Sequence, residues 1–220
     1  MAETTALEAV FVTEIFRSLQ GESTWAGLPC VFIRLSGCNL RCRYCDTTYA
    51  YPRGERMTMP AVAAAVAAFA TPLVEITGGE PLLQPAAPGL ASMLAASGNT
   101  VLVETNGSLL LPEDRSFLAI MDVKCPGSGE AESTLWENFA RLRAGDELKF
   151  VVASRADFDY AVEVVREHGL EARGIPLLIS PAADALAPGP VADWILASGL
   201  SLRLQLQLHR ILWPARHRGV

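Results

Sequence analysis

Three cysteines stand close together in the first quarter of the chain. Cys38, Cys42 and Cys45 follow the spacing C-x3-C-x2-C, directly after an apolar run at residues 31–36. One tight loop with this spacing can wrap an iron–sulfur cubane, because each thiolate meets a different iron. Such clusters typically take four cysteines, so three leave one iron free for a chelating amino acid such as the methionyl end of S-adenosylmethionine. The spacing therefore predicts a [4Fe–4S] cluster that starts radical chemistry.

A structural zinc site is the alternative for the same thiols. Zinc takes four nitrogen or sulfur ligands, commonly from two C-x2-C pairs, and this sequence has only one such pair. Cys30, Cys125 or His209 would have to complete the set. A disulfide scaffold is disfavoured, because the chain has five cysteines, an odd number, and a disulfide framework needs pairs.

Two further strand ends carry residues that suit a ligand. Gly78, Gly79 and Glu80 follow the apolar run at 73–77, and two adjacent glycines let a backbone approach a ligand closely. An ordinary turn would account for the same residues. Glu104 closes the next apolar run, where a buried carboxylate without a partner is costly. It either points into a site or is solvated at the rim.

Two basic residues stand where an anion would need them. Arg34 lies inside an apolar strand, where its guanidinium can fork onto a carboxylate; a salt bridge at the sheet edge is the alternative. Lys124 follows the run at 118–123, and with the Ser128 hydroxyl it could hold a carboxylate or a ribose. The alternative there is a flexible glycine loop with a surface lysine.

The elements that must position these residues alternate between strands and helices. Apolar runs predict strands at residues 31–36, 73–77, 100–104, 118–123, 147–152, 176–179 and 202–206. Such alternation predicts a mainly parallel sheet with its site at the carboxyl ends of the strands. A full eight-unit barrel takes about 250 residues, so 220 residues predict a partial, shortened barrel of α/β class in one domain over 1–220, or a doubly wound sheet.

Helices are predicted from their start and stop signals. Residues 60–70 begin with a proline in the first turn, and residues 89–97 end at Gly98. Ser154 is the expected N-cap of a helix over residues 155–168. No helical pattern is clear at 109–115, and the sequence Pro188-Gly189-Pro190 predicts a turn.

Composition excludes several function classes. Half of the residues are hydrophobic, and a formal charge of −6 argues against a surface that grips nucleic-acid phosphates. The longest apolar stretch, residues 61–70, is too short for a membrane span, which takes about 20 residues. The first ten residues carry two glutamates and no basic residue, unlike a secretory signal. A cytoplasmic protein is expected.

The cysteine loop and the strand ends resemble the radical S-adenosylmethionine superfamily. Its pattern is C-x3-C-x2-C with an aromatic residue before the last cysteine, here Tyr44, which in that family packs near the adenine. The resemblance implies a [4Fe–4S] cluster and S-adenosylmethionine as cofactors. The implied contacts to S-adenosylmethionine are Tyr44, Gly78, Gly79, Glu80, Asn106, Lys124 and Ser128.

Five motifs in order resemble one branch of this superfamily. They are Ser18-Leu19-Gln20-Gly21-Glu22-Ser23, the strand around Arg34, Cys45-Asp46-Thr47, the segment from Asp122 to Gly129, and Gln207-Leu208-His209, which is expected to close the last strand. That branch contracts 6-carboxy-5,6,7,8-tetrahydropterin to 7-carboxy-7-deazaguanine with loss of ammonia, in queuosine and related pathways. The resemblance covers almost the whole chain and implies a homodimer and an electron donor such as a flavodoxin.

The resemblance also implies roles for individual residues. Arg34 binds the pterin carboxylate, and Gln20, Glu22 and His209 bind the amino-pyrimidinone edge. The Thr47 hydroxyl ligates Mg²⁺, which favours oxygen ligands, and Asp46 supports that shell or caps the turn. Glu104 is the candidate for proton transfer in the elimination.

Two points limit the resemblance. A small activase of glycyl-radical enzymes from the same superfamily would share the cysteine loop, but it would have no use for Gln20, Glu22 and His209. The family often ends soon after its Q-x-H segment, whereas this chain continues from Arg210 to Val220 with several basic residues. No contact from this tail to a substrate is therefore carried over.

Overall fold

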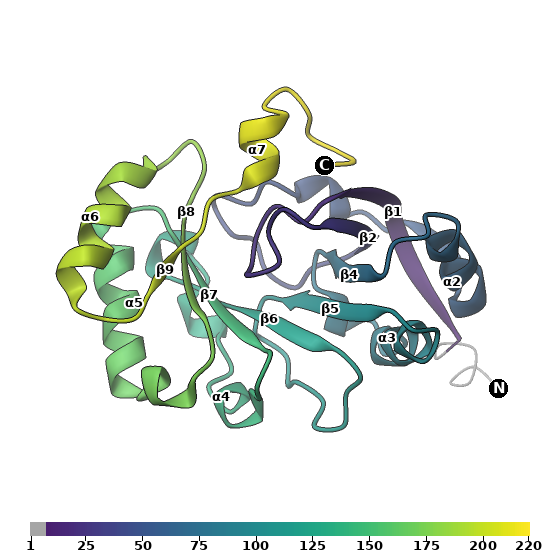
Figure 1. Ribbon diagram of the computed structural model, residues 1–220, viewed down its shortest axis with the longest axis horizontal. Helices are drawn as coiled ribbons and strands as arrows, with labels where there is room; N and C mark the ends of the chain where they lie inside the picture. Colours follow the sequence, from purple (N-terminus) through teal and green to yellow (C-terminus); the bar gives the residue numbers. More distant parts are fainter. Residues whose placement is uncertain (1–7) are drawn as a thin grey trace.

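The computed structural model describes residues 8–220, which form one nine-stranded sheet (Figure 1). The strand order is β3-β1-β2-β4-β5-β6-β7-β8-β9. Strands β1 and β3 are antiparallel to their neighbours, and the pairs from β2 to β9 are all parallel. The bounds are β1 Ala9–Leu19, β2 Pro29–Leu35, β3 Glu55–Thr58, β4 Leu73–Gly78, β5 Thr100–Thr105, β6 Leu118–Val123, β7 Glu147–Val152, β8 Leu177–Pro181 and β9 Arg203–Leu204.

The sheet is mostly parallel and remains open, as the partial-barrel prediction requires. Within the described residues its two edges, β3 and β9, do not pair with each other. All seven predicted strands are present, although β9 is much shorter than the predicted 202–206. Strands β1 and β3 were missed. The prediction of a single domain includes residues 1–7, which lie outside the described part, and it stays a prediction, as does the reading of the first ten residues.

The helices are α2 Met59–Ala67, α3 Ala87–Ala96, α4 Asn138–Arg141, α5 Arg155–Glu167, α6 Pro188–Ser198 and α7 Leu208–Leu212. The helices predicted around 60–70, 89–97 and 155–168 are confirmed, and the Ser154 hydroxyl accepts the N–H of Asp157 as an N-cap should. No helix forms over residues 109–115, as expected.

The predicted turn at Pro188-Gly189-Pro190 is wrong, because these residues form the first turn of α6. Proline is tolerated there since the first N–H groups of a helix have no intrahelical acceptor. The prediction that His209 closes the last strand is also wrong. It lies in the short helix α7, and the strand stops at Leu204.

Two apolar clusters lie on opposite faces of the sheet. The larger one packs the outer face against α2, α3, α5 and α6, which lie along the outside of the strands in Figure 1. The smaller one fills the base of the inner face with Cys30, Phe32, Leu73, Leu102 and Ile120. Because side chains alternate along a strand, the same inner rows continue to the carboxyl ends with polar residues. Among the described residues, no helix is long and apolar enough to cross a membrane.

Candidate active site

A cavity of about 250 Å³ opens at the carboxyl ends of the parallel strands, where the alternating pattern predicted the site. Twelve of the sixteen predicted site residues line it: Gln20, Glu22, Arg34, Cys42, Tyr44, Cys45, Thr47, Gly78, Gly79, Glu104, Asn106 and His209. The other four, Cys38, Glu80, Lys124 and Ser128, are not part of this lining. Residues spread over most of the chain therefore meet at one place.

The cysteine loop, which follows β2, is fixed to the end of β4 by close backbone packing. The N–H of Gly79 donates to the carbonyl of Leu35 at 3.2 Å, and the N–H of Glu80 donates to that of Gly37 at 2.8 Å. A Cβ on Gly79 would stand 2.5 Å from the carbonyl carbon of Gly37 and 2.8 Å from Cβ of Cys38. Gly78 has φ +145°, which strongly favours glycine. The adjacent glycines therefore let the cysteine loop lie against the end of β4.

The donor set of the loop fits an iron–sulfur cluster. Cys38, Cys42 and Cys45 are free thiols that are partly exposed. The N–H of Leu40 lies 3.4 Å from the Cys38 sulfur and the Asn106 amide lies 3.8 Å from it, and hydrogen bonds to sulfur are among the features that tune such clusters. Burial raises the pKa of Cys42, an effect that the nearby Lys124 ammonium opposes.

The zinc alternative finds no support in the geometry. Within residues 8–220, no group of three or more His, Cys, Asp or Glu side chains is arranged to hold a single metal ion. Cys30 and Cys125, two of the three candidates to complete such a site, are fully buried in the apolar clusters. Thiols that each meet a different iron of a cubane need no such convergence.

Glu80 is a buried link between three strand ends. Its carboxylate accepts hydrogen bonds from the N–H of Leu82 at 2.9 Å, the hydroxyl of Thr105 at 2.9 Å and the N–H of Asn106 at 2.7 Å. Burial raises its pKa, and these three donors oppose the rise. Glu80 thereby sets the position of Asn106, whose side chain reaches Asn39 and Cys38 in the cysteine loop.

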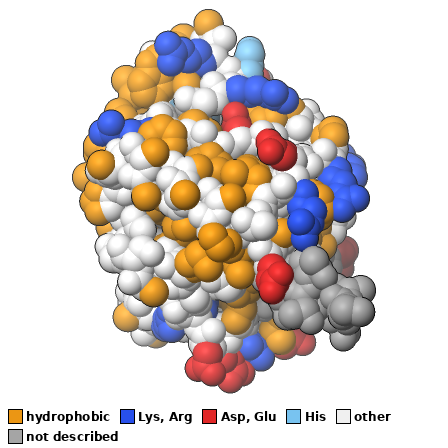
Figure 2. Space-filling model, turned by 90° about the vertical axis from the view of Figure 1, so that its right-hand side faces the viewer, with side chains coloured by type: hydrophobic (Ala, Val, Ile, Leu, Met, Phe, Trp, Pro, Cys, Tyr) orange, Lys and Arg blue, Asp and Glu red, His pale blue; other side chains and the backbone are white. Residues whose placement is uncertain are grey.

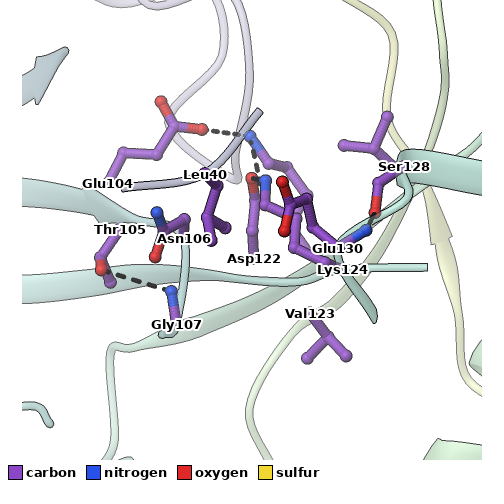
Figure 3. A network of polar contacts seen from close by, with 12 residues as sticks. Leu40, Glu104, Thr105, Asn106, Gly107, Asp122, Val123, Lys124, Ser128 and Glu130 are labelled. Atoms are coloured by element: carbon purple, nitrogen blue, oxygen red, sulfur yellow. Dashed lines mark hydrogen bonds and ion pairs between the residues drawn. The ribbon is translucent and has the colours of Figure 1, made fainter. Parts of the chain in front are cut away.

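Two of the predicted cofactor residues are engaged with the protein itself. The Ser128 hydroxyl donates to the carbonyl of Cys125 at 2.6 Å and accepts the N–H of Glu130 at 3.0 Å, and the residue is fully buried. Lys124 donates to Asp122 at 2.6 Å. Figure 3 shows Lys124 beside Asp122 near the end of β6, and Ser128 on the loop that follows.

Arg34 lines the cavity and also forms a salt bridge, which was the alternative for its strand, while its binding of a carboxylate stays a prediction. Its Nε donates to Glu14 on β1 at 2.8 Å, and the guanidinium lies over the rings of Phe16 and Tyr49. Burial by itself lowers the pKa of Arg34, but Tyr49 and Glu14 outweigh it and raise the pKa. Only Nε is bonded to Glu14, so the terminal nitrogens remain available for a carboxylate.

The segment after β1 carries the other polar groups of the cavity wall. Gln20 donates to Glu75 through its amide and accepts the N–H of Glu22 at 2.7 Å. His209 lies directly over Gly21, where a Cβ would stand 2.7 Å from Nδ1 of the imidazole. Gly21 thus permits α7 to bring His209 to the cavity, and the residue reaches its predicted place from a helix.

Two charged residues at the centre of the cavity were missed by sequence reasoning. Lys149 on β7 is 3% exposed and its ammonium contacts Glu22, Glu104 and Asp122. Glu75 on β4 is 2% exposed. Its burial and, to a smaller extent, repulsion from Glu104 raise its pKa well above the ordinary range. Charged residues inside the apolar runs at 73–77 and 147–152 were a usable signal, the same one that identified Arg34.

The mouth of the cavity is formed in part by the C-terminal segment. Thr47 donates its hydroxyl to Asp46 at 2.8 Å, and both line the cavity. Arg216, His217 and Val220 line it as well, although no contact of this tail was predicted. The tail folds back because Arg218 lies over the ring of Tyr49, 4.3 Å from its centroid.

Comparison with known proteins identifies similar chains. The family model described as the radical SAM superfamily matches residues 32–123. The chain is 44% identical over 226 residues to "7-carboxy-7-deazaguanine synthase" of Koribacter versatilis, covering 95% of this chain and 99% of that one. It is also 44% identical to the protein of the same name from Chlorobaculum tepidum, covering 95% and 96%.

One solved structure is similar over nearly its whole length. The crystal structure of QueE from Escherichia coli superposes with a TM-score of 0.72, covering 91% of this chain and 95% of that chain at 22% sequence identity. At this identity the likeness concerns the fold, a mixed α/β arrangement with a mostly parallel sheet.

Proposed function

This chain belongs to the 7-carboxy-7-deazaguanine synthase family of radical S-adenosylmethionine enzymes, and we propose that it contracts 6-carboxy-5,6,7,8-tetrahydropterin with release of ammonia, as a step of queuosine or other 7-deazapurine biosynthesis. It is an enzyme of the carbon–nitrogen lyase type. One observation carries the proposal: Arg34 lines the same cavity as Cys42 and Cys45. A carboxylated heterocycle bound to Arg34 would therefore lie beside the cysteine loop.

Cys38, Cys42 and Cys45 hold the [4Fe–4S] cluster in this proposal. When bound, the cluster and S-adenosylmethionine supply a carbon radical that takes a hydrogen atom from the substrate. The residues proposed to contact or support S-adenosylmethionine are Tyr44, Gly78, Gly79, Glu80, Asn106, Lys124 and Ser128. Since the polar atoms of Glu80 and Ser128 are taken by the protein, these two act by holding the loops in shape.

The substrate is held at both of its ends. Arg34 forks onto the carboxylate with its free terminal nitrogens, and the pairing with Glu14 keeps the guanidinium fixed. Gln20, Glu22 and His209 lie together on another part of the wall and bind the amino-pyrimidinone edge. An ionised Glu22 is suited to accept two N–H groups, and Lys149 lowers its pKa to about 2 against the opposing effect of burial.

Magnesium and proton transfer are assigned to two further residues. The Thr47 hydroxyl, with Asp46 beside it, offers hard oxygen donors next to the place of the substrate carboxylate. Glu104 keeps a quarter of its side chain exposed toward the cavity while it is paired with Lys149. In this proposal, Glu104 takes a proton from the substrate ring as ammonia leaves.

The partners of the reaction follow from the surface and the thiols. Arg41 and Arg43 are exposed in the cysteine loop, and the tail adds Arg216 and Arg218. Figure 2 shows basic side chains and a histidine gathered at the upper edge of the molecule, at the height of the C-terminal segment in Figure 1. This rim on an otherwise acidic chain supports an acidic electron donor such as a flavodoxin. We also propose a homodimer, by the family resemblance, and a cytoplasmic location, which suits free thiols.

The test is a turnover assay with anaerobically reconstituted protein, S-adenosylmethionine, Mg²⁺, a reductant and the carboxypterin. The wild type should form the deazaguanine, and Arg34→Gln should lose at least about tenfold in kcat/KM, because one charge-assisted contact contributes about 1.5–3 kcal/mol. Arg17→Gln, which removes an exposed arginine on the neighbouring strand, should match the wild type. Cleavage of S-adenosylmethionine without any deazaguanine from the wild type would contradict the assigned substrate.

A further inference from the structure

Lysine is used in only two places in this chain. Of its 18 basic residues, 16 are arginines, and the two lysines are Lys124 and Lys149. Both lysines are buried, and Lys149 lines the cavity. An ammonium is a compact cation with three N–H donors, so it can contact several carboxylates at once. The two lysines therefore mark places where the site holds a buried cation.

Lys149 is the centre of a group of carboxylates from three different segments. Its Nζ lies 2.8 Å from Glu22, in hydrogen-bonded contact with Glu104, and 3.4 Å from Asp122. These acids come from the segment after β1 and from the ends of β5 and β6. Figure 3 shows Glu104 and Asp122 reaching toward a common point from neighbouring strands.

The side chains are ordered in depth. The side chain of Lys149 is 4% exposed, whereas the side chains of Glu22 and Glu104 are 19% and 25% exposed. The ammonium is therefore more deeply buried than the two carboxylates, although Lys149 also lines the cavity. Lys149 donates to one oxygen of each carboxylate. The other oxygen of Glu22 accepts from Gln207 at 2.8 Å, and that of Glu104 accepts from Thr77 at 3.1 Å.

Removing Lys149 would leave Glu22 and Glu104 without this cation, whereas Asp122 would keep its ion pair with Lys124. Burying an unpaired charge is strongly unfavourable, so an acid in that position takes up a proton instead. Glu75 illustrates this in the same cavity, since its only hydrogen-bond donor within the described residues is Gln20 and its pKa is raised. A protonated Glu22 would present an O–H donor to the substrate N–H groups from which it should accept hydrogen bonds.

We propose that Lys149 is a positioning residue that keeps Glu22 ionised and oriented for the amino-pyrimidinone edge of the substrate. The inference rests on the proposed function and deepens it. Lys149 acts through Glu22 and does not touch the substrate itself. Gln205 at 3.1 Å and Gln207 at 2.8 Å complete the hydrogen bonds to the same carboxylate and fix its rotamer.

The experiment is a double-mutant cycle on substrate binding. Anaerobic equilibrium dialysis of reconstituted protein with S-adenosylmethionine and Mg²⁺ measures the Kd of 6-carboxypterin, the oxidised analogue, for the wild type, Lys149→Met, Glu22→Gln and the double variant. Lys149→Met should weaken binding at least about tenfold, and Lys149→Arg should restore most of it because the charge is kept. In the Glu22→Gln background the same change should cost less than about threefold, because coupled residues are not additive.

Arg155→Met removes an exposed charge on α5 and should bind like the wild type. Iron content and melting temperature identify variants that have lost the fold, and for these the Lys149→Arg measurement decides. Equal weakening in both backgrounds, or a Lys149→Arg variant as weak as Lys149→Met, would overturn the positioning role. Failure of the wild type to bind the carboxypterin at all would instead count against the proposed function.

Discussion

Replacing Gly79 by alanine should separate the fold from the ability to hold the cluster. Gly79 lies between the end of β4 and the cysteine loop, and its N–H donates to Leu35. A Cβ at this position would meet the backbone of Gly37 and the Cβ of Cys38, so no flexible side chain can move aside. The added methyl group would therefore act directly on a residue that carries a cluster ligand.

The size of the disturbance follows from the distances. The new Cβ would stand 2.5 Å from the carbonyl carbon of Gly37, whereas real Cβ atoms essentially never come within 3.0 Å of such a neighbour. The carbonyl oxygen of Gly37 would lie closer still to the new Cβ, so the loop must retreat by more than the 0.5 Å that separates the two distances for the carbonyl carbon. Overpacking of this kind typically costs about 1–3 kcal/mol, which a domain of this size can survive.

The assay compares iron content and the visible absorption of the cluster after anaerobic reconstitution. Gly79→Ala should fold, with a melting temperature a few degrees lower, and should hold less than about half of the iron of the wild type. The matched control is Gly189→Ala in α6, where a Cβ meets nothing within 4 Å and alanine is favoured in a helix by about 0.5–1 kcal/mol. A Gly79→Ala protein with a full cluster would refute the reasoning.

Three further changes test individual groups. Glu75→Gln should stabilise the protein at pH 8 and lose this advantage near pH 4. Because the pKa of Glu75 is raised by folding, the wild type loses stability as the pH rises from the pKa of the unfolded state toward that of the folded state. Urea titrations at both pH values measure the difference, and no gain at pH 8 would contradict the prediction. Glu80→Ala leaves buried donors such as the N–H of Asn106 unpaired, each costing about 1–3 kcal/mol of stability. The melting temperature should therefore fall strongly, and the reconstituted variant should hold little iron. A melting temperature equal to that of the wild type would refute this. Ser154→Ala removes an N-cap and should cost about 1 kcal/mol by urea denaturation with unchanged iron content.

The part of the site that the sequence predicts best depends on local spacing. The cysteines, the two glycines and Arg34 belong to short segments at strand ends, and parallel strands bring their carboxyl ends to one edge. A correct assignment of the strands therefore suffices to gather these residues. The same logic located the cavity before any contact between the segments was known.

The errors fall where tertiary contacts override local pattern. Strand β1 has few clear signals because polar residues such as Thr13, Glu14 and Arg17 interrupt its apolar pattern, and it is held by antiparallel pairing with β2 and β3. Helix α6 begins in a Pro-Gly-Pro sequence that suits a turn equally well. Helix α7 has five residues, too few to be stable alone, and it is held where Leu208 donates to the carbonyl of Gly21.

Lys149 and Glu75 were missed for a different reason, since each lies in a strand that was predicted correctly. Side chains alternate along a strand, so Glu147 and Lys149 share a face, as do Leu73, Glu75 and Thr77. The pairing register places Asp122 opposite Lys149 on neighbouring strands. Register is a property of the folded sheet that a single strand does not reveal, so the lysine could be located but its partners could not. The contacts by which Lys149 positions Glu22 are therefore specified by strand pairing, whereas the cysteines that bind the cluster are specified by spacing along the chain.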